Sequence, residues 1–411
     1  MARHDSKLLF KVSSVVKDKK ARHIVQDKEN NKVSVALGMY EVYLSYKNTS
    51  PETAKTELRK LCYLWTFAKL RNIPLEQRLC QGNPLLTADI RAFSFWLSEL
   101  TYTRNGVEKH LDNKTYNAIL TSCSNMVLWF TSQYLKIEGD VSSRYLKLAQ
   151  IESKIRSDFK LQKKKDKKSL QAPDLTEEEI QKIEDYLKPE NNNAPPEIAL
   201  RNYLIWRLVI EFGLRISEVL ALRLEDCPNR KQDYIKIVRI EERGDNYYDP
   251  RAPYEPRPKT LSRDLGFIFS DSPIRKLLND YITKYRFKTI EKFGQKKRVP
   301  IIINPNFLML NHKTRSGAPL SKAAAQDIAR DITKNTGVKF NWHLGRHAFF
   351  NRAYAAIANS KDYGARRMDL VYWGGWADQN SLEIYTNRAK RQQAQKALTF
   401  WQNDNSWEAL K

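Results

Sequence analysis

The chain has 411 residues, which exceeds one ordinary hydrophobic core and predicts two or three domains. Hydrophobic residues make up 41% of it, enough to build such cores, so the composition excludes a disordered chain. The formal net charge of +24, with a pI near 9.7, indicates a polyanionic partner. Because the first 172 residues and the remainder are both basic, we expect two domains that contact DNA, and not a basic tail on a neutral enzyme.

Signals for membranes, secretion and metals are missing from the sequence. No run of 18 apolar residues occurs, and the N-terminus lacks the apolar region and cleavage site of a secretion signal. The cysteines form no CxxC pair, and no nearby histidine completes a zinc pattern. We therefore expect a cytoplasmic, nucleoid-associated protein without a metal or cofactor, and free thiols at Cys62, Cys80, Cys123 and Cys227.

The N-terminal part is predicted to be a basic arm followed by a helical bundle. Residues 1–35 are polar and basic with weak periodicity, which indicates a flexible arm that is at most partly helical. A helix is predicted to begin at Pro51 after a Thr-Ser cap, and two more amphipathic helices are predicted over 87–101 and 112–135. No clear strand signal interrupts them, so residues 36–158 are expected to form a small helical bundle.

A lysine-rich stretch at 159–174 is the best candidate for a linker between domains. Its like charges repel one another, so we expect an extended and mobile segment. Such a segment can also lie along a phosphate backbone. This makes its lysines candidate DNA-binding residues: Lys160, Lys163, Lys164, Lys165, Lys167 and Lys168.

Residues 175–411 are predicted to form a second, mostly helical domain with a small antiparallel sheet. A capping box of Thr176 and Glu179 opens its first helix. Alternation at 234–240 and a returning segment at 265–270 predict two strands on either side of a proline-rich loop. Further helices are expected near 273–293, 321–335, 343–358, 361–373 and 380–402.

Two stretches of this second domain suggest anion binding. In "FGLRISEVLALRLED", Arg215 follows a predicted helix junction and could bind an anion. Glu218 lies three residues later, so the alternative is that the two residues form a structural ion pair. In "HLGRHAFFNRA", His343, Arg346 and His347 gather at a helix start, where backbone N–H groups favour a phosphate. Metal ligation by the two histidines is the rival interpretation, but the glutamate of an HExxH motif is missing.

A third stretch, "WADQNSLEIYTN", places Trp376 nine residues before Tyr385. On its own it favours two packed aromatic residues. In chain order, however, the three stretches resemble the tyrosine recombinase family, which includes phage integrases and site-specific recombinases. "GLRISEVLALRLED" is similar to the first arginine box of that family, "HLGRHAFF" to its H-x-x-R-H box, and "GGWADQNSLEIYTN" to the closing segment that carries the nucleophile.

The resemblance covers nearly the whole chain past residue 36. The stretches "TSPETAKTELRKLCYLWTFAK" and "DNKTYNAILTSCSNMVLWF" resemble helices of the core-binding domain of the family. The implied fold is mainly α: a helical core-binding domain over 36–158 and a mixed α+β catalytic domain over 175–411. The implied activity is metal-independent cleavage and rejoining of DNA through a 3′-phosphotyrosine.

The resemblance also implies a role for each site residue. Tyr385 would be the nucleophile, and Lys259 would protonate the departing 5′ oxygen. Donors to the nonbridging phosphate oxygens would be Arg215, Arg346, His343 and Trp376. Glu218 and His347 would support the site.

Three features depart from the usual family pattern. Gly345 stands where leucine is normal, and we expect it to loosen the local packing. Trp376 stands where most relatives have histidine, and tryptophan donates one hydrogen bond but carries no proton. Residues 241–258 look like an insertion before Lys259, so Lys236 in the preceding strand stays an alternative general acid.

The partners implied by the resemblance are duplex DNA with paired half-sites, a homotetramer on that DNA, and accessory DNA-bending or directionality proteins; no membrane is implied. The segment after Tyr385 would pack on a neighbouring subunit, with Ala394, Ala397, Leu398 and Trp401 on one face. Three other classes remain as alternatives: a type IB topoisomerase, a non-catalytic DNA-binding relative, and an RNA-binding protein, for which no aromatic RNP-type strand is visible.

Overall fold

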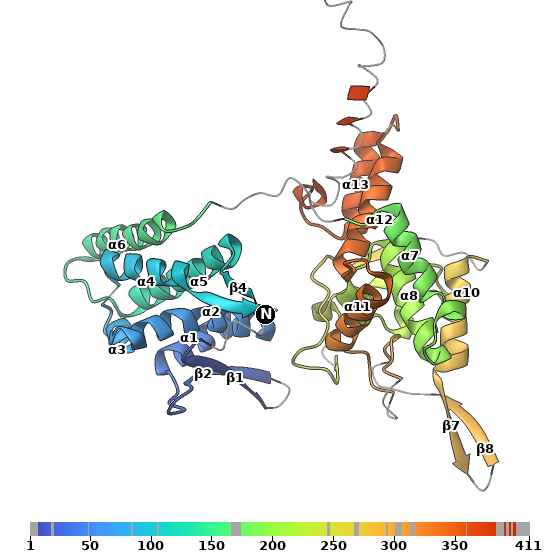
Figure 1. Cartoon of the computed structure of the whole chain (residues 1–411), viewed down its shortest axis with the longest axis horizontal. Helices are drawn as coiled ribbons and strands as arrows, with labels where there is room; N and C mark the ends of the chain where they lie inside the picture. The colour runs from blue at the N-terminus through green and yellow to red at the C-terminus, as the bar shows by residue number, and fades with distance from the viewer. Residues whose placement is uncertain are drawn as a thin grey trace, which may run out of the picture. The chain divides into compact units, whose positions relative to one another are not determined.

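The computed structural model divides the chain into two compact units, residues 1–168 (unit 1) and 169–411 (unit 2) (Figure 1). The residues that it describes exclude 1–6, 18–19, 48, 84, 105–106, 166–173, 245–246, 267–270, 293–294, 301–305, 313–316, 359, 384–389, 392–393, 396–397 and 400–411. Each unit contains its own hydrophobic core, and each is described by itself.

Unit 1 contains a helical bundle, as the spacing of apolar residues predicts. Its helices are α1 (Val35–Tyr46), α2 (Pro51–Leu70), α3 (Leu75–Cys80), α4 (Thr87–Glu99), α5 (Asn113–Tyr134) and α6 (Val141–Leu161). The caps are local: the side chains of Ser50, Asp112 and Asp140 accept hydrogen bonds from backbone N–H groups three residues on. The apolar face of α2 lies in the core and packs against α5.

The prediction of a flexible, partly helical arm before this bundle was wrong. Strand β1 (Phe10–Lys17) pairs antiparallel with β2 (Lys20–Asp27), from Phe10↔Asp27 to Lys17↔Lys20. Valines, which favour strands, are frequent in this segment, and Val25 is 1% exposed where the hairpin packs against the bundle. A second pair that the sequence did not signal, β3 (Thr101–Arg104) and β4 (Val107–His110), connects α4 to α5.

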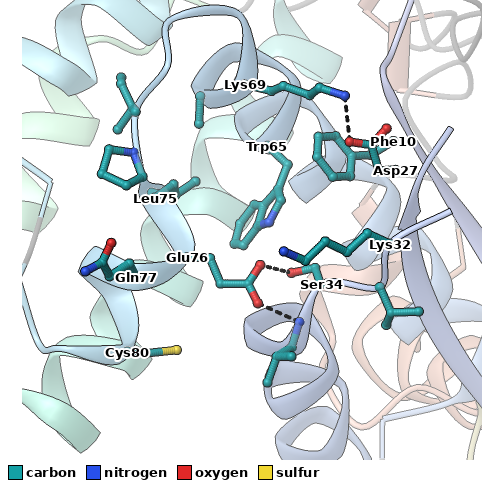
Figure 2. A pocket seen from close by; sticks show the side chains of 15 residues that line it. Phe10, Asp27, Lys32, Ser34, Trp65, Lys69, Leu75, Glu76, Gln77 and Cys80 are labelled. Atoms are coloured by element: carbon teal, nitrogen blue, oxygen red, sulfur yellow. Dashed lines mark hydrogen bonds and ion pairs between the residues drawn. The ribbon is translucent and has the colours of Figure 1, made fainter. Parts of the chain in front are cut away.

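A pocket of about 600 Å³ lies where the first hairpin meets α1, α2 and α3 (Figure 2). On one side the carboxylate of Glu76 accepts hydrogen bonds from the hydroxyl of Ser34 and from the backbone N–H of Val35, at the start of α1. On the other side Lys69 donates to the Asp27 carboxylate over 2.6 Å. The Glu76 contacts hold α3 to the start of α1, and the Lys69–Asp27 pair holds the hairpin to α2, so the hairpin is an integral part of unit 1.

The start of the lysine-rich stretch is also ordered in a way that like-charge repulsion does not predict. Helix α6 continues to Leu161, and the side-chain amide of Asn117 both donates to the carbonyl of Lys164 and accepts from its N–H. Lys164 Nζ lies 4.5 Å from the ring centroid of Tyr116. Residues 160–165 therefore lie against α5 instead of extending away from it. Lys167 and Lys168 lie outside the described residues.

Unit 2 is built around helix α8 (Pro196–Phe212), whose Leu204, Ile205 and Trp206 are fully buried. Helices α7 (Glu177–Leu187), α10 (Pro273–Asp280) and α12 (Trp342–Ile357) pack against it. The other regular elements are α9 (Ile216–Ala221), β5 (Ile235–Ile237), β6 (Arg263–Leu265), β7 (Phe287–Lys292), β8 (Gln295–Pro300), α11 (Lys322–Thr336), α13 (Tyr363–Gly374) and the short helices η1 (Pro189–Asn191), η2 (Leu224–Asp226), η3 (Ile240–Glu242) and η4 (Tyr281–Tyr285).

Strands β5 and β6 pair antiparallel, with Ile235 opposite Leu265. Strand β5 lies within the predicted 234–240, whereas the returning strand lies at Arg263–Leu265, earlier than the predicted 265–270, of which residues 267–270 are outside the described part of the chain. The fold class, mainly α with small antiparallel sheets, is confirmed. The helix expected over 273–293 was too long, because after η4 the chain forms the hairpin β7–β8, with Phe287 opposite Pro300 (Figure 1). Most of the helix expected over 380–402 lies outside the described residues.

Within the described part of the chain, no helix is long and apolar enough to cross a membrane. The four cysteines are free thiols; Cys62, Cys123 and Cys227 are buried and Cys80 is partly exposed.

Candidate active site

The carboxylate of Glu218 lies at the centre of the predicted site and is 1% exposed. Its position follows from a break between two helices: Gly213, with a φ of 62°, ends α8, and α9 begins after Arg215. Glu218 accepts a 2.9 Å hydrogen bond from the backbone N–H of Arg215 and so caps the first turn of α9. A carboxylate buried in this way is stable only where cations and donors surround it.

For Arg215 the sequence leaves two roles open, a structural ion pair with Glu218 and the binding of an anion. Its Nη1 lies 3.6 Å from Glu218 Oε1, so the ion pair is present, and 24% of its side chain remains exposed. Nη1 has no hydrogen-bond partner within the described structure. Nη1 is thus the buried end of the ion pair with Glu218, and it is the exposed part of the Arg215 side chain that an anion at the surface could contact.

Arg346 lies beside the same carboxylate but is completely buried. Its guanidinium donates to the carbonyls of Gly213 over 2.5 Å and Gly374 over 3.0 Å, and Nη1 lies 3.9 Å from Glu218 Oε2. The guanidinium carbon lies 5.0 Å from the centroid of the Trp376 ring. The structure thus brings Arg346 to the site, but a phosphate would reach it only after this packing opens.

The two histidines of helix α12 differ in exposure. His343 is exposed and His347 is 6% exposed, and their ring centroids are 4.6 Å apart. The side chain of Asn341 accepts from the backbone N–H of His343 and of Leu344, so these two donors of the helix start already have a partner. The expected anion site at this helix start would therefore depend on side chains.

Both histidines are shifted towards the neutral form. His343 is exposed, but the protein around its ring removes part of the surrounding water, and this partial desolvation lowers its pKa; the positive charges of Arg346 and Arg215 lower it further. Burial, together with His343 and Arg346, lowers the pKa of His347 to about 4. At neutral pH each ring therefore offers one N–H donor and one acceptor nitrogen. No group of three metal-binding side chains occurs among the residues that the structure describes, so the rival metal site lacks a third ligand there.

The turn that carries Lys259 reaches the same cluster. Lys259 itself is exposed, while the hydroxyl of Thr260 donates to Glu218 and the N–H of Leu261 donates to the carbonyl of Gly375 over 3.0 Å. Lys236, the alternative, is an exposed residue of β5 that stands opposite Asp264. The neighbours of Lys259, and not the partner of Lys236, thus contact the buried carboxylate.

Trp376 closes the other side of the cluster and is 8% exposed. Helix α13 ends at Gly374, and Gly375 turns the chain with a φ of 63°, so that the Trp376 ring packs 4.6 Å from that of Phe350. Tyr385, the predicted nucleophile, lies outside the described residues.

Thr260 and Arg263 are members of this cluster that the sequence reasoning missed. Nη2 of Arg263 lies 3.2 Å from Glu218 Oε2, and its side chain is 1% exposed. Burial alone would raise the pKa of Glu218, but the charges of Arg263 and Arg346 outweigh this and hold it below its usual value. The available signal was the position of Arg263 two residues before the apolar Leu265, which in a strand places both side chains on the same, buried face.

Residues 173–392 match the phage integrase family, which is more than half of the chain. The chain therefore belongs to the phage integrase family. Over 149 residues it is 28% identical to transposase A from transposon Tn554 of Staphylococcus aureus (strain N315). That alignment covers 36% of this chain and 34% of the relative, so the chain matches about a third of the length of this relative.

Two solved structures share the fold. One is the XerH site-specific recombinase bound to a palindromic difH substrate, in a post-cleavage complex; its TM-score is 0.53 at 17% identity, over 89% of this chain and 85% of that one. The other is the Tn1549 transposon integrase in complex with circular intermediate DNA; its TM-score is 0.51 at 14% identity, over 87% of this chain and 99% of that one.

Proposed function

We propose that this protein is a site-specific DNA recombinase of the integration or excision type. The observation that carries the proposal is the convergence on Glu218 of the predicted site segments: the arginine box with Arg215, the turn after Lys259, and the box with Arg346. Membership of the phage integrase family supports it, because the matched residues 173–392 include all three segments.

The proposed reaction exchanges one phosphate ester for another. The Tyr385 oxygen attacks a DNA phosphorus, a bond forms between them, and the bond to the 5′ oxygen breaks. Since the phosphotyrosine keeps the ester energy, reversal of this step rejoins DNA without ATP. Arg215 stabilises the charge on the nonbridging oxygens, and the neutral His343 offers one further donor. Arg346 and Trp376 join them once the packing around Arg346 opens.

Lys259 supplies the proton that the departing 5′ oxygen needs. It is preferred to Lys236 because its neighbour Thr260 is anchored to Glu218, which ties the turn to the arginines. Glu218 and His347 orient the site from the buried side.

The proposed partner is duplex DNA with paired half-sites, on which four copies of the chain assemble. The excess of positive charge favours this partner, and the lysines at 160–165 form an exposed edge of unit 1 that can follow a phosphate backbone. Accessory DNA-bending or directionality proteins would act on the same complex.

The substitution Tyr385→Phe tests the proposal, because it removes only the attacking oxygen. Full-length protein is incubated with nicked duplexes that carry the repeated sequences flanking its own gene. We expect the wild type to form a protein–DNA adduct that resists SDS, and the variant to bind the same DNA without an adduct. An adduct in the variant would exclude Tyr385 as the nucleophile, and a wild type without any adduct would contradict the proposed activity.

A further inference from the structure

Arg263 connects three separate segments of unit 2 at the candidate active site. Its Nε donates to the carbonyl of Trp373 over 2.7 Å, at the end of α13. Its Nη1 donates to the Thr260 hydroxyl over 2.9 Å, and its Nη2 to Glu218 over 3.2 Å. One planar guanidinium therefore holds the start of α9, the turn after Lys259 and the end of α13 together.

The contact between these segments leaves little room for adjustment. A Cβ added to Gly375 would lie 2.6 Å from Nη1 of Arg263 and 2.8 Å from the Cβ of Thr260. The Leu261 N–H also donates to the Gly375 carbonyl over 3.0 Å. Because the Arg263 and Glu218 side chains are 1% and 0% exposed, water cannot replace either partner without disrupting this packing.

We propose that Arg263 is a positioning residue for strand cleavage, which acts by holding the turn that presents Lys259. The proposal rests on the proposed function. Lys259 is exposed and follows a proline-rich loop, whereas Thr260, one residue later, is buried and hydrogen-bonded to both Arg263 and Glu218. The position of the Lys259 backbone is thus set by its neighbours, and these are held by the Arg263 guanidinium together with Glu218.

The consequence is a defect in proton delivery and not in DNA binding. When the guanidinium is removed, the turn keeps the direct hydrogen bond from Thr260 to Glu218 but loses the link through Arg263 to Glu218 and Trp373. With one of its supports missing, the turn no longer holds the Lys259 ammonium at the 5′ oxygen. A small displacement of a catalytic group costs up to about a hundredfold in rate. A leaving thiolate needs no proton, so sulfur in place of the 5′ bridging oxygen bypasses the step that depends on Lys259.

The experiment compares the full-length wild type with Arg263→Gln and Arg263→Lys on two DNA substrates, with oxygen or sulfur at the 5′ bridging position. For Arg263→Gln we expect normal DNA affinity, cleavage of the oxygen substrate slower by roughly tenfold or more, and near wild-type cleavage of the sulfur substrate. Arg263→Lys keeps the charge but not the fork of donors, so its defect on the oxygen substrate should be intermediate.

Arg251→Gln is the matched control. Arg251 forms a buried pair with Asp249, with side chains 9% and 1% exposed, and donates to the carbonyls of Leu220 and Leu320 in the same unit. Its loss should lower stability without changing the ratio between the sulfur and oxygen rates. This separates general destabilisation from an effect on proton delivery.

Two results would overturn the proposal. The first is that Arg263→Gln cleaves the oxygen substrate at the wild-type rate. The second is that Arg263→Gln stays slow on the sulfur substrate, although the same substrate restores cleavage by Lys259→Ala. If Arg263→Gln does not fold, the same ratio of sulfur to oxygen rates is measured for Thr260→Val. That variant removes the hydroxyl that donates to Glu218 and accepts from Arg263. A wild type that cleaves neither substrate would contradict the proposed function itself, so the two failures are distinguishable.

Discussion

At the scale of single residues, the contacts of the residues beside Lys259 and opposite Lys236 decide which of the two lysines is the expected general acid. Thr260 anchors the turn of Lys259 to the buried carboxylate, while Lys236 pairs across a two-stranded sheet with Asp264. Lys259→Ala should therefore cleave an ordinary substrate on the order of a hundredfold more slowly, and recover most of that rate on the sulfur substrate. Lys236→Ala should cleave both at the wild-type rate, and the opposite pattern would reverse the assignment.

His347 makes the stability of unit 2 depend on pH. Its pKa in the folded chain is about 4, against an ordinary value of 6.5, so the unfolded chain binds the proton first as the pH falls. The contribution of the neutral ring is complete above 6.5 and is lost as the pH falls towards 4. His312, with a pKa also near 4, acts in the same direction.

We expect urea to unfold the wild type at lower concentrations at about pH 5 than at about pH 7. His347→Gln should reduce this difference without abolishing it, because His312 remains. An unchanged difference in the variant would show that His347 does not titrate in this range.

At the scale of elements, the contact between α12 and α8 explains Gly345. A Cβ at this position would lie 2.9 Å from Cγ1 of Val209, which is itself fully buried in α8. The sequence-based expectation that Gly345 loosens the packing was wrong, because the missing side chain is what allows the two helices to approach. The same contact sets the position of Arg346, the next residue of α12.

Gly345→Ala should therefore lower the free energy of unfolding by about 1–3 kcal/mol, since the core must shift to accept the methyl group. Gly364→Ala in α13 is the control, because its Cβ would meet nothing within 4 Å. That variant should be neutral or more stable by up to about 1 kcal/mol through helix propensity. Equal effects in urea unfolding would refute the packing explanation.

At the scale of the whole molecule, positive charge is distributed over both units, and one basic element stands apart. The hairpin β7–β8 projects from the body of unit 2 (Figure 1), and it contains Lys288, Lys292, Lys296, Lys297 and Arg298 against the single Glu291. A two-stranded ribbon fits the major groove of duplex DNA. Binding to DNA should thus weaken steeply with salt.

Replacing Lys296, Lys297 and Arg298 by alanine should weaken binding to duplex DNA. It should also flatten the dependence of log K on log salt, by about 0.9 for each phosphate that the variant no longer neutralises. Fluorescence anisotropy between about 50 and 200 mM salt measures this slope. Replacing Lys322, Arg330 and Lys334, three basic residues of α11, by alanine removes the same number of positive charges and serves as the charge control. If the two variants change the slope equally, net charge and not the hairpin determines binding.

What the sequence determined by itself depends on neighbours within a few residues. The caps of α2, α5 and α7 and the apolar faces of α2 and α8 follow from spacing along the chain, which is why the helical bundle and the order of the helices could be predicted. The order of the three boxes also indicated the family, and membership of the phage integrase family confirms it.

Tertiary structure decided whatever depends on residues far apart in the chain. The hairpins β1–β2 and β7–β8 were missed because strand pairing depends on a partner strand, which weak local periodicity does not reveal. Arg263 was missed because its partner Glu218 lies 45 residues earlier. Arg346 was predicted to bind a phosphate, but its burial against the carbonyls of Gly213 and Gly374 was not foreseen. The spacing of residues along the sequence indicates which charged residues belong to the site. Only the packing of segments that are distant in the chain determines which of these residues contact one another.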